Sequence, residues 1–333
     1  MAGAEAGGAE LFFERLAAAM HDTGDAVLPV IRRDAGRAER LAAAGLLPAQ
    51  LRFGGALDLV TRPRLGTMLR AFAPRVAVAW MNRAARMTPR GSWVLSGRLG
   101  GYYDLKYYRR CDHLIGNTRG IVDWIIRQGW PAARVHHLPN FAPDLLGASP
   151  AALPTPPGVP VVLALGRLHR NKAFDVMIRA LPLLPGIHAV IAGEGPERTA
   201  LLALARQEGV SDRLHLLGWR TDQGALLAAC DVLACPSRHE PLGNVVIEAF
   251  SAGRPVVAAD AAGPVELIQD GVTGLLVPRE EPQRLADAVG AVLAAPALSA
   301  RLAAAGRARF LAEHCAAPVL DRWRSTLATL EHA

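Results

Sequence analysis

The sequence predicts an α/β protein built from two doubly wound domains, each a parallel sheet covered by helices. Three observations predict this class. Short apolar runs alternate with amphipathic stretches in the first half, a proline-rich break follows, and the alternation then restarts more regularly. Alternation of strands and helices at this spacing implies parallel sheets with helices on both faces. The 333 residues suffice for two domains, each with its own core.

The first domain is expected over residues 1–142. Its apolar runs predict strands at 26–31, 75–80, 113–117 and 135–140. Amphipathic spacing predicts helices at 9–20, 37–44 and 118–128. Residues 82–90 are expected to form a polar loop after the second of these strands.

Residues 143–160 are predicted to be a linker, because they hold six prolines, two glycines and no periodicity. The second domain is expected over 161–317, and a C-terminal helix at 318–333 has a return toward the first domain as one option. The predicted strands are 161–165, 189–192, 213–217, 232–234 and 255–259. The predicted helices are 174–181, 197–208, 222–229, 244–252, 264–269, 282–294 and 300–314. Open parallel sheets bind ligands at the carboxyl ends of their strands, so both domains are expected to point loops into a shared cleft.

The composition is that of a soluble globular protein, with 51% hydrophobic and 20% charged residues. No apolar run approaches the ~18–20 residues of a membrane span, and the N-terminus lacks the basic start and apolar core of a signal peptide. Four scattered cysteines without a C-x-x-C pair favour reduced thiols over disulfides or metal. We therefore expect a cytoplasmic protein.

Positive charge is concentrated in the first domain. Between Leu59 and Arg110, eleven basic residues face a single acid, Asp104, within a chain of net charge +7. The segment is either a solvated basic surface or a site for an anionic partner, meaning a phosphorylated acceptor or an anionic membrane surface. No helix-turn-helix, zinc-finger or RNA-recognition signature accompanies the charge, so nucleic acid is not expected as a partner.

One stretch, residues 237–250, carries two carboxylates around a predicted helix start. Glu240 lies among loop-forming residues, and Glu248 lies inside the apolar helix 244–252. Gly243 and Asn244 fall where free backbone N–H groups would face a ligand. A loop acid, a helix N-terminus and a helical acid one turn later suit a polar ligand with hydroxyls and phosphates.

A second stretch, residues 166–175, places two cations after the first strand of the second domain. Arg167 follows the strand directly, and Lys172 precedes a helix. Two such cations suit a diphosphate, although a solvated loop is the alternative. Only two of the 37 basic residues are lysines, and Lys172 is one of them.

Weaker signals follow other strands. Gly193 begins a Gly-x-Gly turn, and Gly218-Trp219 could line a nucleobase pocket, with ordinary turn formation and packing as the alternatives. Residues 100–110 hold all four tyrosines together with cations. Tyr102, Tyr103 and Lys106 suit a sugar or phosphosugar acceptor, or else the segment is a helix that packs two tyrosines inward.

With residues 254–260, 263–268 and 270–277, these stretches carry a family resemblance. The chain resembles bacterial nucleotide-sugar-dependent glycosyltransferases of the GT-B fold, of the retaining kind grouped in glycosyltransferase family 4, which have two Rossmann-like domains. The resemblance is clear from Val161 to about Leu285. It implies that Glu248 holds the ribose hydroxyls and that Glu240 is a catalytic residue that contacts the donor sugar. It also implies catalytic diphosphate binding by Arg167 and Lys172, with further donor contacts from Gly243, Asn244, Val245, Gly193 and Gly218.

In the first domain the resemblance rests on fewer residues. Gly7 and Gly8 match a glycine-rich turn that in the family follows the first strand, but only six residues precede it, so that strand is missing from the prediction. We favour a truncated start, because a missing central strand leaves an unpaired edge inside the sheet. Asn82 stands nearest a position where many members carry a histidine, and Asn140 lies at the expected cleft edge.

The resulting hypothesis is transfer of a hexose-like sugar from a nucleoside diphosphate sugar, with retention, to a cell-envelope glycan or lipid-linked precursor. Lipopolysaccharide or polysaccharide biosynthesis at the inner face of the cytoplasmic membrane is the expected setting, with peripheral contact to anionic lipid as an option. No metal and no cofactor beyond the donor substrate are expected. The alternatives are a nucleotide-sugar epimerase or hydrolase of the same fold, or a non-catalytic nucleotide-sugar-binding envelope protein.

Overall fold

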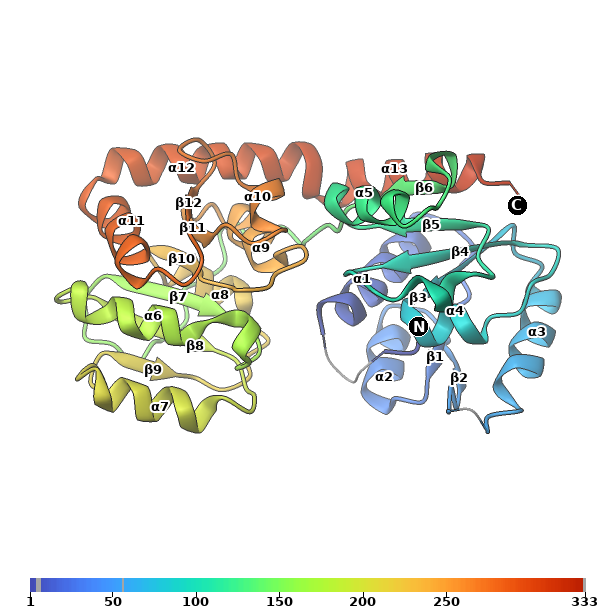
Figure 1. Ribbon diagram of the computed structural model, residues 1–333, viewed down its shortest axis with the longest axis horizontal. Coiled ribbons are helices and arrows are strands. Elements are labelled where there is room, and N and C mark those ends of the chain that lie inside the picture. The colour runs from blue at the N-terminus through green and yellow to red at the C-terminus, as the bar shows by residue number, and fades with distance from the viewer. Residues whose placement is uncertain (4–6, 56, 332–333) are drawn as a thin grey trace. The chain divides into compact units, whose positions relative to one another are not determined.

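The computed structural model describes residues 1–3, 7–55 and 57–331. The chain forms two compact units, shown in Figure 1. Unit 1 comprises Met1–Asn140 and Ala316–Ala333, and unit 2 comprises Phe141–Cys315. All strand pairs in both units are parallel, which confirms the predicted α/β class with parallel sheets.

Unit 2 is organised around one six-stranded sheet with the order β12-β11-β10-β7-β8-β9. Its strands are β7 (Val161–Leu165), β8 (His188–Ala192), β9 (Leu214–Leu216), β10 (Val232–Cys235), β11 (Val256–Ala259) and β12 (Leu275–Val277). The chain runs outward from β7 to β9, crosses back to β10, and runs outward again on the other side. The strand order therefore reverses between β7 and β10, which is where sheets of this type bind ligands.

Two apolar cores cover the two faces of this sheet. Alternate residues of β7 separate cleanly: Val162 and Ala164 join one core, while Val161, Leu163 and Leu165 join the other. The helical segments of unit 2 are η3 (Arg170–Lys172), α6 (Phe174–Ala180), η4 (Leu181–Leu183), α7 (Arg198–Gln207), α8 (Gln223–Ala228), α9 (Asn244–Ser251), α10 (Pro264–Leu267), α11 (Pro282–Ala294), α12 (Pro296–Arg309) and the π-helical turn η5 (Phe310–His314). The strands β7, β10 and β11 are buried on both faces, so their apolar runs were readable in the sequence, whereas the partly buried edge strand β12 was not predicted.

The proline-rich stretch after unit 1 contains no helix or strand, yet it packs on unit 2. The Ala142 N–H donates to the His314 carbonyl at 3.1 Å, and the Ala151 N–H donates to the Ala225 carbonyl at 2.9 Å. Arg307 pairs with Asp144 at 2.6 Å. These contacts attach the proline-rich stretch to the surface of unit 2.

Unit 1 contains two separate sheets, β1-β2 and β3-β4-β5-β6. The strands are β1 (Val30–Arg32), β2 (Ala49–Leu51), β3 (Val76–Trp80), β4 (Val94–Leu99), β5 (His113–Gly116) and β6 (Val135–His137). The helical segments are α1 (Gly8–Asp22), α2 (Ala35–Ala43), α3 (Thr61–Phe72), α4 (Met81–Met87), η1 (Leu105–Tyr108), α5 (Arg119–Arg127), η2 (Ala132–Arg134) and α13 (Ala316–Thr329). The helix predicted at residues 9–20 is confirmed as α1.

The last helix, α13, completes unit 1. Arg324 of α13 pairs with Asp25 at 2.8 Å, and Trp323 stacks on Trp80 with ring centroids 6.3 Å apart. Both tryptophans are nearly fully buried. The C-terminal segment is therefore part of the core of unit 1.

Several predictions for unit 1 were wrong. Residues 82–90 are not a polar loop, because α4 occupies Met81–Met87 and buries Ala84, Ala85 and Met87. Strand β4 was not predicted, although all six of its residues are buried, because Ser96, Gly97 and Arg98 interrupt its apolar run. Strand β2 and helix α3 were also missed.

Within the described ranges, no single helix is both long and apolar enough to cross a bilayer. The segments Pro282–Ala294 and Pro296–Thr329 meet the length and composition requirements only together, as a pair bent by 100°. Helix α11, the first of these segments, buries Leu285 and Val289 in the core of unit 2.

Candidate active site

Polar residues gather where the strand order of unit 2 reverses. Strand β7 ends at Leu165 and leads into Gly166 and Arg167, and β10 ends at Cys235 and leads into the loop that carries Glu240. The neighbouring strands β7 and β10 are paired through Val162–Val232 and Leu163–Leu233. The carboxyl ends of these two strands therefore bring the cationic stretch, residues 166–175, and the acidic stretch, residues 237–250, to the same edge of the sheet.

Lys172 and Glu240 form an ion pair at this edge. The Ser237 hydroxyl also donates to the Glu240 carboxylate, at 3.3 Å. Burial is the largest single effect on Lys172 and favours the neutral amine. The charges of Glu240, Cys235 and Glu248 and the hydrogen bond to Glu240 together outweigh it, so the pKa of Lys172 is raised. Glu240 is only 8% exposed, so a cation and an anion are held together in a largely dry setting.

Arg238 holds the Glu240 loop in place. Its guanidinium pairs with Asp175 at 2.6 Å, pairs with Glu280, and donates to the Arg170 carbonyl at 3.0 Å. Hydrogen bonding to Asp175 raises the pKa of Arg238, against the opposing effect of burial. The sequence analysis did not assign Arg238, because its partners lie 63 and 42 residues away along the chain.

Two glycines allow the chain to approach itself closely at this site. Gly243 precedes α9 with φ of 96°, a left-handed conformation that a side chain disfavours. At Gly193 a Cβ atom would lie 1.8 Å from the Gly166 carbonyl oxygen, so only glycine fits. The predicted importance of both positions therefore has a steric basis.

Helix α9 supplies the remaining predicted donor contacts. It begins at Asn244, so the N–H groups of Asn244 and Val245 belong to its first turn, where α-helical backbone bonding starts. Glu248 is half-buried one turn further along, and its charge contributes to raising the pKa of Lys172. Lys172, Glu240 and Glu248 are thus electrostatically coupled, as one site requires.

Arg167 and Trp219 are both presented to solvent. Arg167 is exposed and forms no ion pair with any described residue. Trp219 is 52% exposed, so it is not core packing. It follows Gly218, which forms a bridge with Gly193 and so brings the ends of β8 and β9 together. An exposed cation and an exposed aromatic ring remain available to a ligand.

The predicted first-domain residues lie in unit 1. Gly7 precedes α1 and Gly8 is its first residue. Asn82 follows Met81, whose φ of 68° is a strained conformation for a non-glycine residue. Among the described residues, the buried Asn82 Oδ1 atom has no hydrogen-bond partner. A strained backbone and an unsatisfied buried amide are features that cluster at functional sites, so Asn82 remains a predicted cleft residue.

The sequence analysis missed Arg98 as a site residue. Its guanidinium lies 4.3 Å from the Trp80 ring centroid and 5.0 Å from that of Phe12, and it bonds to the Asn140 side chain. Arg98 is 1% exposed, and burial lowers its pKa to about 9. It forms no ion pair within the described chain. A lone arginine inside a buried strand was the signal that could have identified it.

Arg98 is part of a polar cluster at the carboxyl ends of the unit 1 strands. Asn82, Asn117 and Asn140 follow β3, β5 and β6, respectively, while Arg98 lies near the end of β4. The buried Asn117 Oδ1 has no partner among described groups, and neither has Arg98 Nε. Unsatisfied buried groups at a sheet's carboxyl edge indicate a place for a polar ligand.

The tyrosine-rich segment is divided between surface and core. Tyr102 is 38% exposed and meets Trp124 edge-on at 5.6 Å, while Tyr108 is fully buried in η1. Burial raises the pKa of the partly buried Tyr103. Lys106 is exposed and pairs with Asp104 at 2.6 Å. The inward-packing alternative therefore holds for Tyr108, while Tyr102, Tyr103 and Lys106 remain predicted acceptor contacts.

A hollow of about 450 Å³ in unit 1 is rich in positive charge. Its basic lining residues are Arg62, Arg86, Lys106, Arg109 and Arg110. Among the described residues that line it, Asp58 is the only acidic one. Five of the eleven basic residues between Leu59 and Arg110 thus line one concave surface, and this charge suits an anionic partner.

Within the described part of the chain, no group of three or more His, Cys, Asp or Glu side chains is arranged to hold a metal ion. The four cysteines are free thiols. Burial raises the pKa of Cys235, beside the Lys172–Glu240 pair, to about 11, so this thiol is protonated at neutral pH. Cationic side chains and helix amides are the groups that this site offers to an anion.

Comparison with known proteins places these residues in a family context. Residues 159–295 match the family model described as glycosyl transferases group 1. Over 330 aligned residues the chain is 34% identical to the lipopolysaccharide core biosynthesis glycosyltransferase LpsE of Rhizobium meliloti (strain 1021), covering 97% of this chain and 96% of the relative. LpsD of the same organism, also named a lipopolysaccharide core biosynthesis glycosyltransferase, is 32% identical over 308 residues, covering 90% and 89%.

Solved structures share the fold. Anabaena Alr3699/HepE, determined in complex with UDP-glucose, superposes with a TM-score of 0.84 at 22% identity, covering 99% of this chain and 98% of that one. The GT-B architecture that the sequence motifs imply is thereby supported over the whole chain.

Proposed function

This chain belongs to the group 1 glycosyltransferases, and from that premise we propose that its donor is a nucleoside diphosphate sugar. The observation that most strongly supports this proposal is the Lys172–Glu240 ion pair beside α9, at the carboxyl edge where the strand order of unit 2 reverses. The similar fold of a protein solved with UDP-glucose supports a donor of this class. The transferred unit is hexose-like.

Different chemical groups of the donor are bound by different site residues. Arg167 and Lys172 bind the diphosphate, together with the amides of Gly243, Asn244 and Val245. Glu248 accepts hydrogen bonds from the ribose hydroxyls, and Glu240 accepts them from the sugar. Gly193 and Gly218 let the backbone of β8 and β9 approach the nucleotide, beside the exposed ring of Trp219.

The reaction breaks the bond between the sugar C1 and the diphosphate oxygen, which departs with the bonding electron pair. The acceptor hydroxyl oxygen forms the new bond to C1 from the same face, and its proton passes to the departing phosphate oxygen. Lys172 and Arg167 stabilise the negative charge on the leaving diphosphate. The ion pair with Lys172 makes Glu240 a poor covalent nucleophile, which supports retention through this front-side route of a family 4 enzyme.

The acceptor is a cell-envelope glycan or its lipid-linked precursor, in lipopolysaccharide or polysaccharide biosynthesis. Two relatives named for lipopolysaccharide core biosynthesis support this class. Gly7, Gly8, Asn82, Tyr102, Tyr103 and Asn140 are the proposed acceptor contacts. Peripheral binding to the inner face of the cytoplasmic membrane is supported by the basic hollow and by Leu57 and Leu59, which are 95% and 81% exposed beside its lining residue Asp58.

The experiment combines the purified chain, a panel of radiolabelled nucleotide sugars and a lipid-linked glycan extract. We expect label from one donor to enter the glycan fraction with the anomeric configuration of the donor, and a chelator to leave the rate unchanged. Label released as free or epimerised sugar without acceptor would instead identify a hydrolase or epimerase. Donor binding without any turnover would identify a non-catalytic protein.

A further inference from the structure

Three consecutive residues of the Glu240 loop (residues 236–243) meet three consecutive residues of η3 in the same order. The contacts are Arg238 with Arg170, His239 with Asn171 and Glu240 with Lys172. The first is a hydrogen bond from the guanidinium to a carbonyl at 3.0 Å, the second is a backbone hydrogen bond at 3.2 Å, and the third is the ion pair of the candidate site. The two segments therefore lie side by side, and the Lys172–Glu240 pair is one end of their contact.

Arg238 also bonds beyond η3 to the helix that follows it. Its two Nη atoms donate to the two carboxylate oxygens of Asp175 at 2.7 and 2.6 Å, and Asp175 lies in the first turn of α6. Its Nε atom donates to Glu280, which lies shortly before α11. Arg238 is thus bonded on both sides of Lys172 along the chain, to Arg170 before it and to Asp175 after it.

The geometry of these bonds requires an arginine at position 238. A guanidinium presents its N–H groups in a rigid plane that matches a carboxylate, whereas a lysine offers a single nitrogen on a flexible stem. The two carboxylates of Asp175 and Glu280 already balance the positive charge of Arg238. Arg238 is therefore suited to fixing its neighbours rather than to binding a diphosphate itself.

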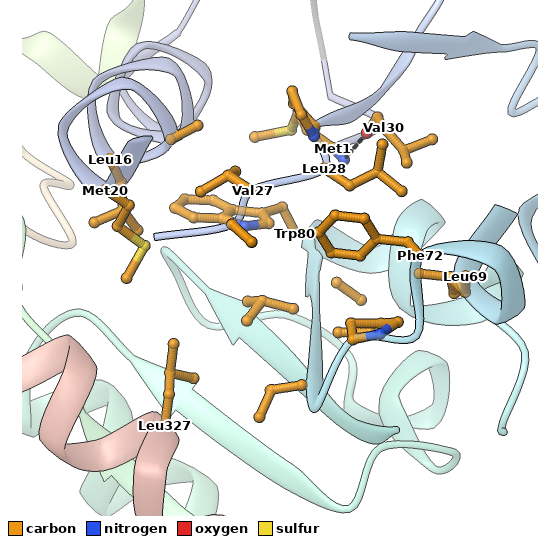
Figure 2. A pocket seen from close by; sticks show the side chains of 18 of the residues that line it. Met1, Leu16, Met20, Val27, Leu28, Val30, Leu69, Phe72, Trp80 and Leu327 are labelled. Atoms are coloured by element: carbon orange, nitrogen blue, oxygen red, sulfur yellow. Dashed lines mark hydrogen bonds between the residues drawn. The ribbon is translucent and has the colours of Figure 1, made fainter. Parts of the chain in front are cut away.

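The segments that Arg238 joins contain strained backbone. Among the described residues, five that are not glycine have a positive φ angle. Three of them belong to unit 1, at or beside an apolar hollow of about 680 Å³ whose lining residues Figure 2 shows: Phe53, Ala73 and Met81. The other two are Ala173, with φ of 53°, between η3 and α6, and Glu280, with φ of 63°. Such conformations persist only where the surrounding structure enforces them, and the bonds of Arg238 span both positions in unit 2.

We propose that Arg238 is a positioning residue for sugar transfer, which clamps η3 to the Glu240 loop so that Lys172 and Glu240 keep one geometry at the donor. This inference rests on the proposed function, in which Lys172 meets the departing diphosphate. A helix of three residues has little stability of its own, and a lysine side chain is flexible. Without the clamp the Lys172 Nζ atom occupies a wider range of positions, and a misplacement of about 1 Å can lower a rate by about 10²-fold.

The first test compares the kinetics of Arg238→Ala and Arg238→Lys with those of Arg179→Ala. Arg179 provides the matched control, because it pairs with the same Asp175 carboxylate at 3.0 Å and has no bond to η3 or to the Glu240 loop among the described residues. Both Arg238 variants should lower kcat by about 10–100-fold, change the donor KM by less than about threefold and keep Tm within about 4 °C. The control should retain the wild-type kcat and KM.

Arg238→Lys separates positioning from direct binding of the donor. The lysine keeps the positive charge but loses the planar set of N–H groups. If Arg238 bound the diphosphate as a charge, Arg238→Lys would transfer sugar normally and Arg238→Ala would mainly raise the donor KM. That pair of results would overturn the proposal.

Acylation of lysine reports on the clamp without any substrate. The chain contains two lysines, Lys106 and Lys172, whose side chains are 55% and 24% exposed. Opening of the clamp should raise the acylation rate of Lys172 relative to Lys106 by about threefold or more in Arg238→Ala and in Asp175→Asn, but not in Arg179→Ala. Peptide mass spectrometry measures both rates in one sample, so Lys106 is the internal control.

A double variant tests whether Arg238 and Asp175 act as one unit. Arg238→Ala and Asp175→Asn break the same bonds, so their combination should lower kcat no further than either change alone. Additive losses would overturn the proposal, as would unchanged acylation of Lys172 in a folded Arg238→Ala variant. Failure of the proposed function gives a different result: the wild-type chain would then transfer no sugar, while the acylation rates would still show whether Arg238 holds Lys172.

Discussion

The two units present opposite electrostatic arrangements at the carboxyl edges of their sheets. In unit 2, Lys172 is paired with Glu240, and its pKa is raised despite burial. In unit 1, Arg98 is buried between two aromatic rings, has no ion pair in the described chain, and has a lowered pKa. A buried cation that is paired with an anion destabilises the fold little and can still bind an anionic ligand. An unpaired buried cation destabilises its unit until a bound ligand compensates the charge.

From this difference we expect separate tasks at the two edges. The unit 2 edge is expected to govern binding and departure of the nucleotide. The unit 1 edge is expected to govern the acceptor. Variants at the two edges should therefore change different measured quantities, and the comparison fails if they do not.

The largest effect is expected for Lys172→Ala. Loss of one preorganised cation should lower the rate of sugar transfer by about 10²–10³-fold. The measurement is initial-rate transfer of labelled sugar, with Arg206→Ala on the exposed face of α7 as the matched control. Because Glu240 would be left buried without its partner, the double variant Lys172→Ala/Glu240→Gln should also be inactive while retaining the wild-type Tm within a few degrees. Normal transfer by this folded double variant would remove Lys172 from the mechanism.

The next effect is expected for Glu248→Gln. Replacing a charged acceptor of ribose hydrogen bonds should weaken nucleoside diphosphate binding by about 10–100-fold, since such bonds contribute about 1.5–3 kcal/mol. Calorimetric titration gives the Kd, and Glu39→Gln on the exposed surface of α2 is the control. An unchanged Kd would place the ribose elsewhere.

A smaller effect, on the transfer rate but not on nucleotide affinity, is expected for Arg98→Met. Transfer should fall by about tenfold while the nucleotide Kd stays unchanged. Tm should remain within about 3 °C, because the variant removes an unpaired buried charge and keeps much of its volume. Rate, Kd and Tm are measured on the same preparation. A weaker nucleotide Kd with an unchanged acceptor KM would assign Arg98 to the donor and break the division between the two edges.

The pH dependence of stability should distinguish wild type from Glu240→Gln. In the wild type the folded pKa of Lys172 lies above its unfolded value of about 10.4, so its stabilising contribution is complete below that pH and is lost as the pH rises through the folded value. Without the charge of Glu240, burial lowers this pKa and the loss begins at a lower pH. Tm measured from about pH 7 to 11 should show the earlier decline. Superimposable profiles would mean that Glu240 does not control the charge of Lys172.

The smallest effect is expected at the basic hollow of unit 1. Arg109→Ala should weaken binding to vesicles containing anionic lipid by about fivefold, since one arginine near such a surface contributes about 1 kcal/mol. Its Tm should not change, because Arg109 is exposed. Cosedimentation with vesicles is the measurement, and Arg127→Ala on α5 is the control. Equal losses for both variants would indicate only a general charge effect.

The fold of unit 2 was largely readable from sequence, whereas that of unit 1 was not. Strand β7 was predicted with its observed bounds, because a strand buried on both faces is a continuous apolar run. In unit 1, β4 is equally buried but contains Arg98. The buried residues of α4 alternate with arginines, so its apolar face was not recognised in the sequence. In these two elements charged and polar residues interrupt the apolar pattern that would reveal a buried strand or helix.

The candidate site shows a similar limit. Glu240 and Lys172 were each identified from the residues around them, but their pairing joins positions 68 residues apart and follows from the order of β7 and β10 in the sheet. Arg238 was missed for the same reason. Its role comes from contacts with Asp175 and Glu280, which no local pattern contains.

Thermal denaturation in the presence of UDP, GDP, ADP and CMP tests the central claim most directly. A ligand that binds only the folded chain raises its apparent stability by about 2.7 kcal/mol at one hundred times its Kd. One nucleoside diphosphate should therefore raise the Tm of the wild-type chain clearly, and the increase should disappear in the Lys172→Ala/Glu240→Gln double variant. The claim would be contradicted if none of the nucleotides stabilised the wild type, or if the double variant were stabilised to the same extent.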